Sequence, residues 1–208
     1  MQNSHRKDKV EVAVENWFSD LGDSTLRLDY SLTPDSIVLD LGGYQGDFAF
    51  EIHRKYGCFV YIFEPVKKFY EHCVERFEGN SKISVIPYGI SDRSSFAFIS
   101  VEDNKSSVVH KYSDKFERIR LVDIKQVFDE LDIEIVDLLK INVEGSEFLI
   151  IPSLIDSNLM KRVNNLQVQF HTFYPNAKKH RRSIRKKLSQ THTEVWNYYF
   201  VWESWTLK

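Results

Sequence analysis

Residues 38–48 read VLDLGGYQGDF, a short apolar run that ends in a glycine-rich turn and continues as an amphipathic segment. The β-branched start predicts a buried strand, and the 3.6-residue apolar period after Asp47 predicts a helix that ends near Tyr56. The glycines at 42, 43 and 46 let the backbone turn sharply and approach a ligand closely. The stretch therefore predicts a strand–turn–helix unit that binds a ligand at its turn.

The turn does not match the fingerprint of a dinucleotide site. A GxGxxG pattern that starts at Gly42 would need glycine at 44 and 47, where this chain has Tyr44 and Asp47. A carboxylate at the helix start also repels a pyrophosphate. S-adenosylmethionine (SAM) has no phosphate and carries an ammonium and a sulfonium, so it tolerates a carboxylate such as Asp40. The Asp-x-Gly-x-x-x-Gly pattern of residues 40–46 therefore favours SAM over NAD.

An acidic residue follows the next predicted strand, 59–63. Glu64 at that place can accept hydrogen bonds from both ribose hydroxyls of a nucleoside, although a solvated glutamate is the alternative interpretation. Residues 89–91 follow a third strand and are placed to contact the adenine ring, or they form a plain loop. The predicted cofactor residues are Asp40, Gly42, Gly43, Tyr44, Gly46, Glu64, Pro65, Gly89 and Ser91.

Strand and helix patterns alternate along the rest of the chain. Further strands are predicted at 83–86, 136–141 and 166–170, and further helices at 10–21, 67–77, around 127–131 and at 176–190. Residues 95–120 mix short strand-like pieces, 96–101 and 119–122, with polar loops. Two aromatic strands, 195–200 and 202–207, close the chain. Because almost nothing connects them, the last strand should run antiparallel to its neighbour.

The predicted fold class is α/β, a Rossmann-like class I methyltransferase fold. We expect a mainly parallel seven-stranded sheet with an antiparallel strand near its C-terminal edge and helices on both faces. The 208 residues suit a single methyltransferase domain, with a helical extension over 1–33 and the core over 34–208. Two cysteines outside any CxxC pair, and no apolar run of signal or membrane length, predict a soluble cytoplasmic protein.

Three motifs resemble the FkbM family of SAM-dependent methyltransferases, from about residue 37 to 155. They are LDLGGYQG at 39–46, FEP at 63–65 and VDLLKINVEGSE at 136–147, which is similar to the family signature Lys-x-Asp-x-Glu-Gly-x-Glu. QFH at 169–171 and FVWESW at 200–205 look like a branch found among glycan-modifying proteins. The resemblance implies O-methylation of sugars or of natural-product hydroxyls.

The chain departs from the family signature at one position, where Asn142 replaces the usual Asp. An amide orients ligands by hydrogen bonding, but it cannot act as a general base and is a poor ligand for a hard cation. If the family depends on that Asp, this protein uses another group or has lost activity.

Polar groups that follow the fourth and fifth core strands are the candidates for catalysis. Asn142, Glu144, Glu147 and His171 can converge, because the carboxyl ends of parallel strands meet at one edge of the sheet. We prefer His171 as the base, since its ordinary pKa lies near neutrality; a structural histidine is the alternative. Glu144 is assigned to the site and Glu147 to a helix N-terminus. These groups could hold Mg²⁺, but no spacing demands it, so no metal is predicted.

Residues 178–187 read KKHRRSIRKK, the strongest charge cluster in the chain. It predicts either a solvated helix face or a positive rim that gathers an anionic acceptor. The aromatic residues of 196–205 suggest sheet core, or alternatively a platform for sugar rings.

The leading function is O-methylation of a sugar hydroxyl on a glycan or related small molecule. The alternatives are a nucleic-acid or protein methyltransferase and a non-catalytic SAM-binding protein, the latter motivated by Asn142. No RNA-binding module is recognisable, and the net charge of −2 does not favour nucleic acid. A homodimer through the N-terminal helix is compatible with the sequence.

Overall fold

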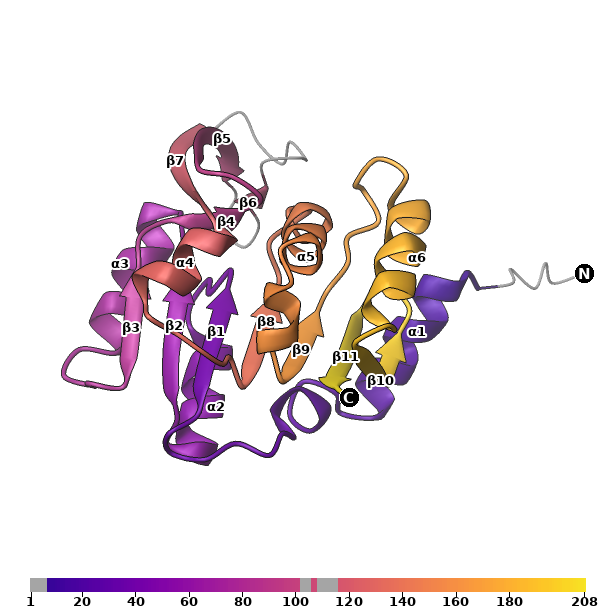
Figure 1. Ribbon diagram of the computed structural model, residues 1–208, viewed down its shortest axis with the longest axis horizontal. Coiled ribbons are helices and arrows are strands. Elements are labelled where there is room, and N and C mark those ends of the chain that lie inside the picture. Colours follow the sequence, from indigo (N-terminus) through magenta and orange to yellow (C-terminus); the bar gives the residue numbers. More distant parts are fainter. Residues whose placement is uncertain (1–6, 102–105, 108–115) are drawn as a thin grey trace, which may run out of the picture.

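The computed structural model describes residues 7–101, 106–107 and 116–208, and it is built around a twisted sheet with helices packed against it (Figure 1). The main sheet has seven strands in the order β10 (His192–Tyr198), β11 (Trp202–Leu207), β9 (Asn165–Val168), β8 (Leu138–Ile141), β1 (Ile37–Leu41), β2 (Phe59–Phe63) and β3 (Ile83–Ile86). All neighbours pair in parallel except β11, which is antiparallel to both β9 and β10. The predicted sheet is confirmed, including the antiparallel strand near its C-terminal edge.

Helices cover both faces of this sheet, as predicted. The helices are α1 (Lys9–Ser19), α2 (Asp47–Tyr56), α3 (Lys67–Arg76), α4 (Ile124–Glu130), α5 (Glu147–Asp156) and α6 (Ala177–Leu188), with short 3-10 turns at Leu26–Leu28 and Leu159–Arg162. Alternate residues of a strand point to opposite faces. Val38 of β1 accordingly packs with Ile52 of α2, whereas its neighbour Leu39 packs with Phe128 of α4 and Ile150 of α5.

The N-terminal helix α1 is part of the same packed unit. Asp8 caps it by accepting hydrogen bonds from the amides of Val10 and Glu11. Its Trp17 is buried against Trp202 of β11. No helix within the described ranges is both long and apolar enough to cross a bilayer.

A second, smaller sheet lies over the carboxyl ends of β1 and β2 (Figure 1). Its strand order is β4 (Gly89–Ser91), β7 (Phe116–Asp123), β5 (Ser95–Val101) and β6 (Ser106–Ser107). The sequence predicts only short strand-like segments in this region, at 96–101 and 119–122. In the structure β5 and β7 pair antiparallel, with Ser95–Ser100 of β5 facing Phe116–Leu121 of β7. The loop alternative for residues 89–91 is wrong, because they form a strand. The rest of the predicted loop falls at 102–105 and 108–115, outside the described residues.

Other differences from the predicted elements have local causes. The sequence indicates a helix N-terminus at Glu147 but gives no bounds for helix α5, which contains Pro152, a residue that normally interrupts a helix pattern. Strand β8 starts two residues later than predicted, because Val136 makes only an isolated bridge to Val163.

Candidate functional site

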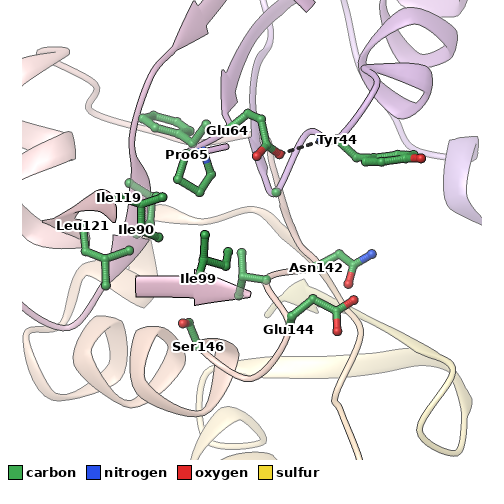
Figure 2. A pocket seen from close by; sticks show the side chains of 14 residues that line it. Tyr44, Glu64, Pro65, Ile90, Ile99, Ile119, Leu121, Asn142, Glu144 and Ser146 are labelled. Atoms are coloured by element: carbon green, nitrogen blue, oxygen red, sulfur yellow. Dashed lines mark hydrogen bonds between the residues drawn. The ribbon is translucent and has the colours of Figure 1, made fainter. Parts of the chain in front are cut away.

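A cavity of about 820 Å³, part of it open to solvent, lies between the carboxyl ends of the main strands and the small sheet (Figure 2). Its lining residues are Gly42, Tyr44, Phe63, Glu64, Pro65, Gly89, Ile90, Ile99, Ile119, Leu121, Asn142, Val143, Glu144 and Ser146. One wall is apolar and comes mainly from the small sheet, and the opposite side is polar.

The glycine-rich turn after β1 approaches neighbouring chain too closely for side chains. Gly42 has φ +81°, and a β-carbon there would lie 2.0 Å from the carbonyl oxygen of Asn142. At Gly43 a β-carbon would lie 2.1 Å from Cγ2 of Ile62. Gly46, with φ +80°, precedes α2 directly. The glycines are therefore required by close packing against neighbouring chain, and the approach of this backbone to a ligand stays a prediction.

Glu64 is held rigidly at the end of β2. Its Oε2 accepts the amide N–H of Tyr44 at 2.8 Å, drawn in Figure 2, and its Oε1 accepts that of Val66 at 2.9 Å. The residue is only 4% exposed, so the alternative of a solvated glutamate is wrong. Burial raises the pKa of Glu64 to about 7, against the opposing effect of the two amides. Each oxygen keeps a lone pair for a ligand hydroxyl.

A buried ion pair holds the glycine-rich turn that follows β1. The parallel register sets Asp40 beside Lys140. Lys140 Nζ donates to Asp40 Oδ1 at 2.7 Å and to the carbonyl of Gly42 at 2.8 Å. Burial lowers the pKa of Lys140, while Asp40 opposes that change. Sequence reasoning missed Lys140, although the family signature begins with it, because its partners lie about a hundred residues earlier in the chain.

The segment after β8 carries the acidic part of the site. Glu147 is fully buried, and its Oε2 accepts the amide N–H of Gly145 at 2.8 Å. Its Oε1 accepts the amide of His171 at 2.9 Å and lies 3.0 Å from His171 Nδ1. A carboxylate only accepts hydrogen bonds, so Nδ1 carries a proton. Nε2 of the same ring lies 3.4 Å from Oε1 of Glu144. Glu147 thereby orients His171, and His171 contacts Glu144.

The charge state of His171 follows from this arrangement. Burial by itself would lower the pKa of His171, but Glu144 and Glu147 outweigh it and raise the pKa to about 9. At neutral pH the ring is therefore a cation between two carboxylates. Figure 2 shows Glu144 on the cavity wall beside Asn142, whose Oδ1 is buried and has no hydrogen-bond partner.

The structure brings seven of the predicted site residues to the cavity: Gly42, Tyr44, Glu64, Pro65, Gly89, Asn142 and Glu144. Four other predicted residues do not line the cavity and lie close to residues that do: Asp40, Gly43, Gly46 and His171. Ser91 is buried beyond the lining and donates to Oδ1 of Asp92 at 3.2 Å. The apolar residues of the small sheet were missed, since nothing in the local sequence of β5 and β7 indicates a pocket.

The donor set suits SAM better than a phosphate-bearing cofactor. The described lining includes no lysine, arginine or histidine to neutralise a phosphate. It offers an apolar wall for a ring, the Glu64 carboxylate for hydroxyl donors and the orphaned Asn142 Oδ1 for another donor. Across the described ranges, no group of three or more His, Cys, Asp or Glu residues is arranged to hold a metal ion.

Comparison with solved structures shows the same fold. The chain is similar to a putative rRNA methylase from Clostridium thermocellum, with a TM-score of 0.57 and 10% identity over 91% of this chain and 95% of that one. It is also similar to a fibrillarin/Nop5p complex chain, with a TM-score of 0.53 and 15% identity over 92% and 81%. An rRNA methylase from Streptococcus thermophilus gives a TM-score of 0.50 and 11% identity over 91% and 95%. No curated protein matches the sequence.

Sequence comparison identifies the family. A family model described as the methyltransferase FkbM domain matches residues 40–198. This range is most of the chain, and it includes the glycine-rich turn, Glu64, the 136–147 motif and His171. The chain therefore belongs to the FkbM family of SAM-dependent methyltransferases.

Proposed function

We propose that the protein transfers the methyl group of SAM to a hydroxyl of a sugar, on a glycan or a related small molecule. The observation that carries the proposal is the cavity-facing carboxylate of Glu144, backed by His171 at the carboxyl edge of the sheet. A hydroxyl is a poor nucleophile at neutral pH, and a positioned base beside it assists the reaction.

The cofactor would be held by the turn and the small sheet. Glu64 would accept the ribose hydroxyls, and Gly89 with the apolar residues of β5 and β7 would contain the adenine ring. The close approach of Gly42 to Asn142 would place backbone against the amino-acid end. When bound, SAM supplies a methyl group on a sulfonium, which the acceptor oxygen takes by in-line displacement.

Proton removal is assigned to Glu144 and His171 together. Glu144 lines the cavity, so its carboxylate would contact the acceptor hydroxyl and receive its proton. His171, the base preferred from the sequence, would hold that carboxylate in place and stabilise its charge. The orphaned oxygen of Asn142 would orient the acceptor or the cofactor by accepting a hydrogen bond.

The cofactor is tested by calorimetric titration with SAM and, separately, with NAD. Gly42→Ala should abolish SAM binding, because the added β-carbon meets the Asn142 carbonyl. Gly79→Ala is the matched control, since Gly79 has φ +79° but nothing within 4 Å of the added carbon. Equal SAM affinity in both variants, or binding of NAD instead of SAM, would contradict the proposal.

The reaction is tested by supplying methyl-labelled SAM with a panel of neutral and acidic oligosaccharides, RNA and protein. Label on a sugar that survives alkali is expected, because a methyl ether resists the hydrolysis that cleaves a methyl ester. Transfer of the label only to RNA or only to protein would contradict the assignment of a sugar as the acceptor. Tight SAM binding without transfer to any acceptor would favour the non-catalytic alternative.

A further inference from the structure

Helix α6 has an unusual charge distribution. Its twelve residues, AKKHRRSIRKKL, include seven lysines and arginines and no acidic residue. Lys178 and Lys179 lie in its first turn, where the positive end of the helix dipole disfavours cations. Like charges three and four residues apart also repel one another. The dipole favours the cations of the last turn, Arg185, Lys186 and Lys187, but it does not explain those of the first turn.

The inward-facing cations of α6 have structural partners. Arg181 Nε donates to Oε1 of buried Glu203 at 2.6 Å, and Arg185 Nη1 donates to the other oxygen at 2.5 Å. Arg185 also pairs with Glu194. Lys187 pairs with Asp156 of α5 at 2.9 Å. These contacts attach α6 to the sheet and account for three of the seven charges.

The remaining four are Lys178, Lys179, Arg182 and Lys186, which we call the outward stripe of α6; Lys178, at its start, also borders a hollow beside Lys9 and Val10 of α1. All four are exposed, and within the described residues none of their side chains has a hydrogen bond or ion pair. Positions 179, 182 and 186 lie on one face at helical spacing. With a rise of about 1.5 Å per residue, the stripe extends over about 12 Å.

The outward stripe begins on the side of the main sheet where the carboxyl ends of the parallel strands lie, which is also the side that holds the cavity. The chain leaves the carboxyl end of β9, passes through His171 and enters the first turn of α6 (Figure 1). Tyr174 stacks on Phe148 at 4.4 Å, which holds this connection against α5. Six residues lie between His171 and Lys178, so the α-carbons of these two residues are within about 25 Å of each other.

Resting on the proposed function, we infer that the outward stripe of α6 binds the acidic sugar units of an extended anionic glycan while a neighbouring unit occupies the cavity. Unpartnered cations complement carboxylate or phosphate groups on such a chain. Nucleic acid fits less well, because α6 carries no Phe, Tyr or Trp on which bases could stack.

The inference is tested by calorimetry with a hexamer of galacturonic acid, which has one carboxylate per sugar, and with neutral maltohexaose. Wild-type protein should bind the acidic hexamer, more weakly as salt is added, and should not bind maltohexaose. The variant Lys178→Glu/Lys179→Glu/Arg182→Glu should lose at least about tenfold in affinity for the acidic hexamer. Glutamate is favourable in a first turn, so this variant should fold.

Arg54→Glu/Arg93→Glu/Lys161→Glu is the matched control, since it makes the same charge change at exposed positions elsewhere. Unchanged binding in the α6 variant, an equal loss in the control, or no binding by wild type would overturn the inference. Tighter binding of a uridine hexanucleotide than of the acidic sugar would also overturn it. The affinity for SAM, measured in the same samples, should be equal in wild type and both variants. If wild type does not bind SAM, the proposed function is contradicted instead.

Discussion

At the scale of single residues, two residues of the cavity wall have a positive φ, a backbone conformation that residues with a β-carbon rarely adopt. Tyr44 has φ +50° and Glu144 has φ +52°. Such conformations persist only when the surrounding structure imposes them, and they concentrate at functional sites. The backbone N–H of Tyr44 donates a hydrogen bond to the Glu64 carboxylate, which holds Tyr44 in this conformation. Glu144 precedes Gly145, whose amide is bonded to Glu147.

The role of Glu144 predicts a specific kinetic effect. Glu144→Gln keeps the shape of the side chain but removes the proton acceptor, so kcat should fall by about 100- to 10,000-fold. SAM affinity should change little. The control Glu51→Gln alters a partly exposed glutamate of α2 that pairs with Arg54, away from the cavity, and should keep full activity. Steady-state kinetics with the sugar acceptor found in the screen check this, and an unchanged kcat in Glu144→Gln would contradict the assignment.

His171 predicts a pH dependence of stability. Its pKa is raised to about 9 in the folded protein, above the ordinary value of 6.5. The stabilisation from its ion pairs is therefore fully present below pH 6.5 and is lost as pH rises through 9. The Tm of wild type should drop between pH 7 and 10 by more than that of His171→Gln. Parallel Tm curves from differential scanning calorimetry would show that the ring is not charged.

At the scale of elements, α6 has one face that is attached to the sheet and one face that is free. The neighbouring residues Arg181 and Arg182 belong to different faces, so substitutions at these two positions can distinguish them. Arg181→Met removes a partner of buried Glu203 and should cost about 3 kcal/mol, the lower end of such losses, because Arg185 still pairs with it. Arg182→Met removes an exposed charge and should change stability by no more than about 0.5 kcal/mol. Urea unfolding measures both, and equal effects would contradict this division of the helix.

At the scale of the whole molecule, the N-terminal helix and the core should unfold together. Trp17 of α1 is buried against β11, so residues 1–33 and 34–208 are expected to form one domain. A single calorimetric transition is predicted. SAM at one hundred times its Kd should stabilise the fold by about 2.7 kcal/mol and raise Tm by about 5–11 °C. NAD at the same concentration should have no effect, and two separate transitions would contradict the single domain.

The sequence by itself determined the strand–turn–helix unit, the succession of the main strands along the chain, the antiparallel closing strand and the family. These features depend on local signals: apolar periodicity, the glycines of the turn and the short connection between β10 and β11. Half of the cavity-lining residues, seven of fourteen, followed from them, because the ends of parallel strands meet at one edge of the sheet.

Only the tertiary structure decided the features that depend on distant partners and burial. Ser95–Val101 and Phe116–Asp123 pair as strands, and their Ile99, Ile119 and Leu121 pack on Val66 and Phe69. Lys140 supports the turn because the register places it beside Asp40. The charge of His171, and the division of α6 into an attached and a free face, likewise follow from carboxylates on other elements. Residues so far apart in the chain leave no pattern in the local sequence.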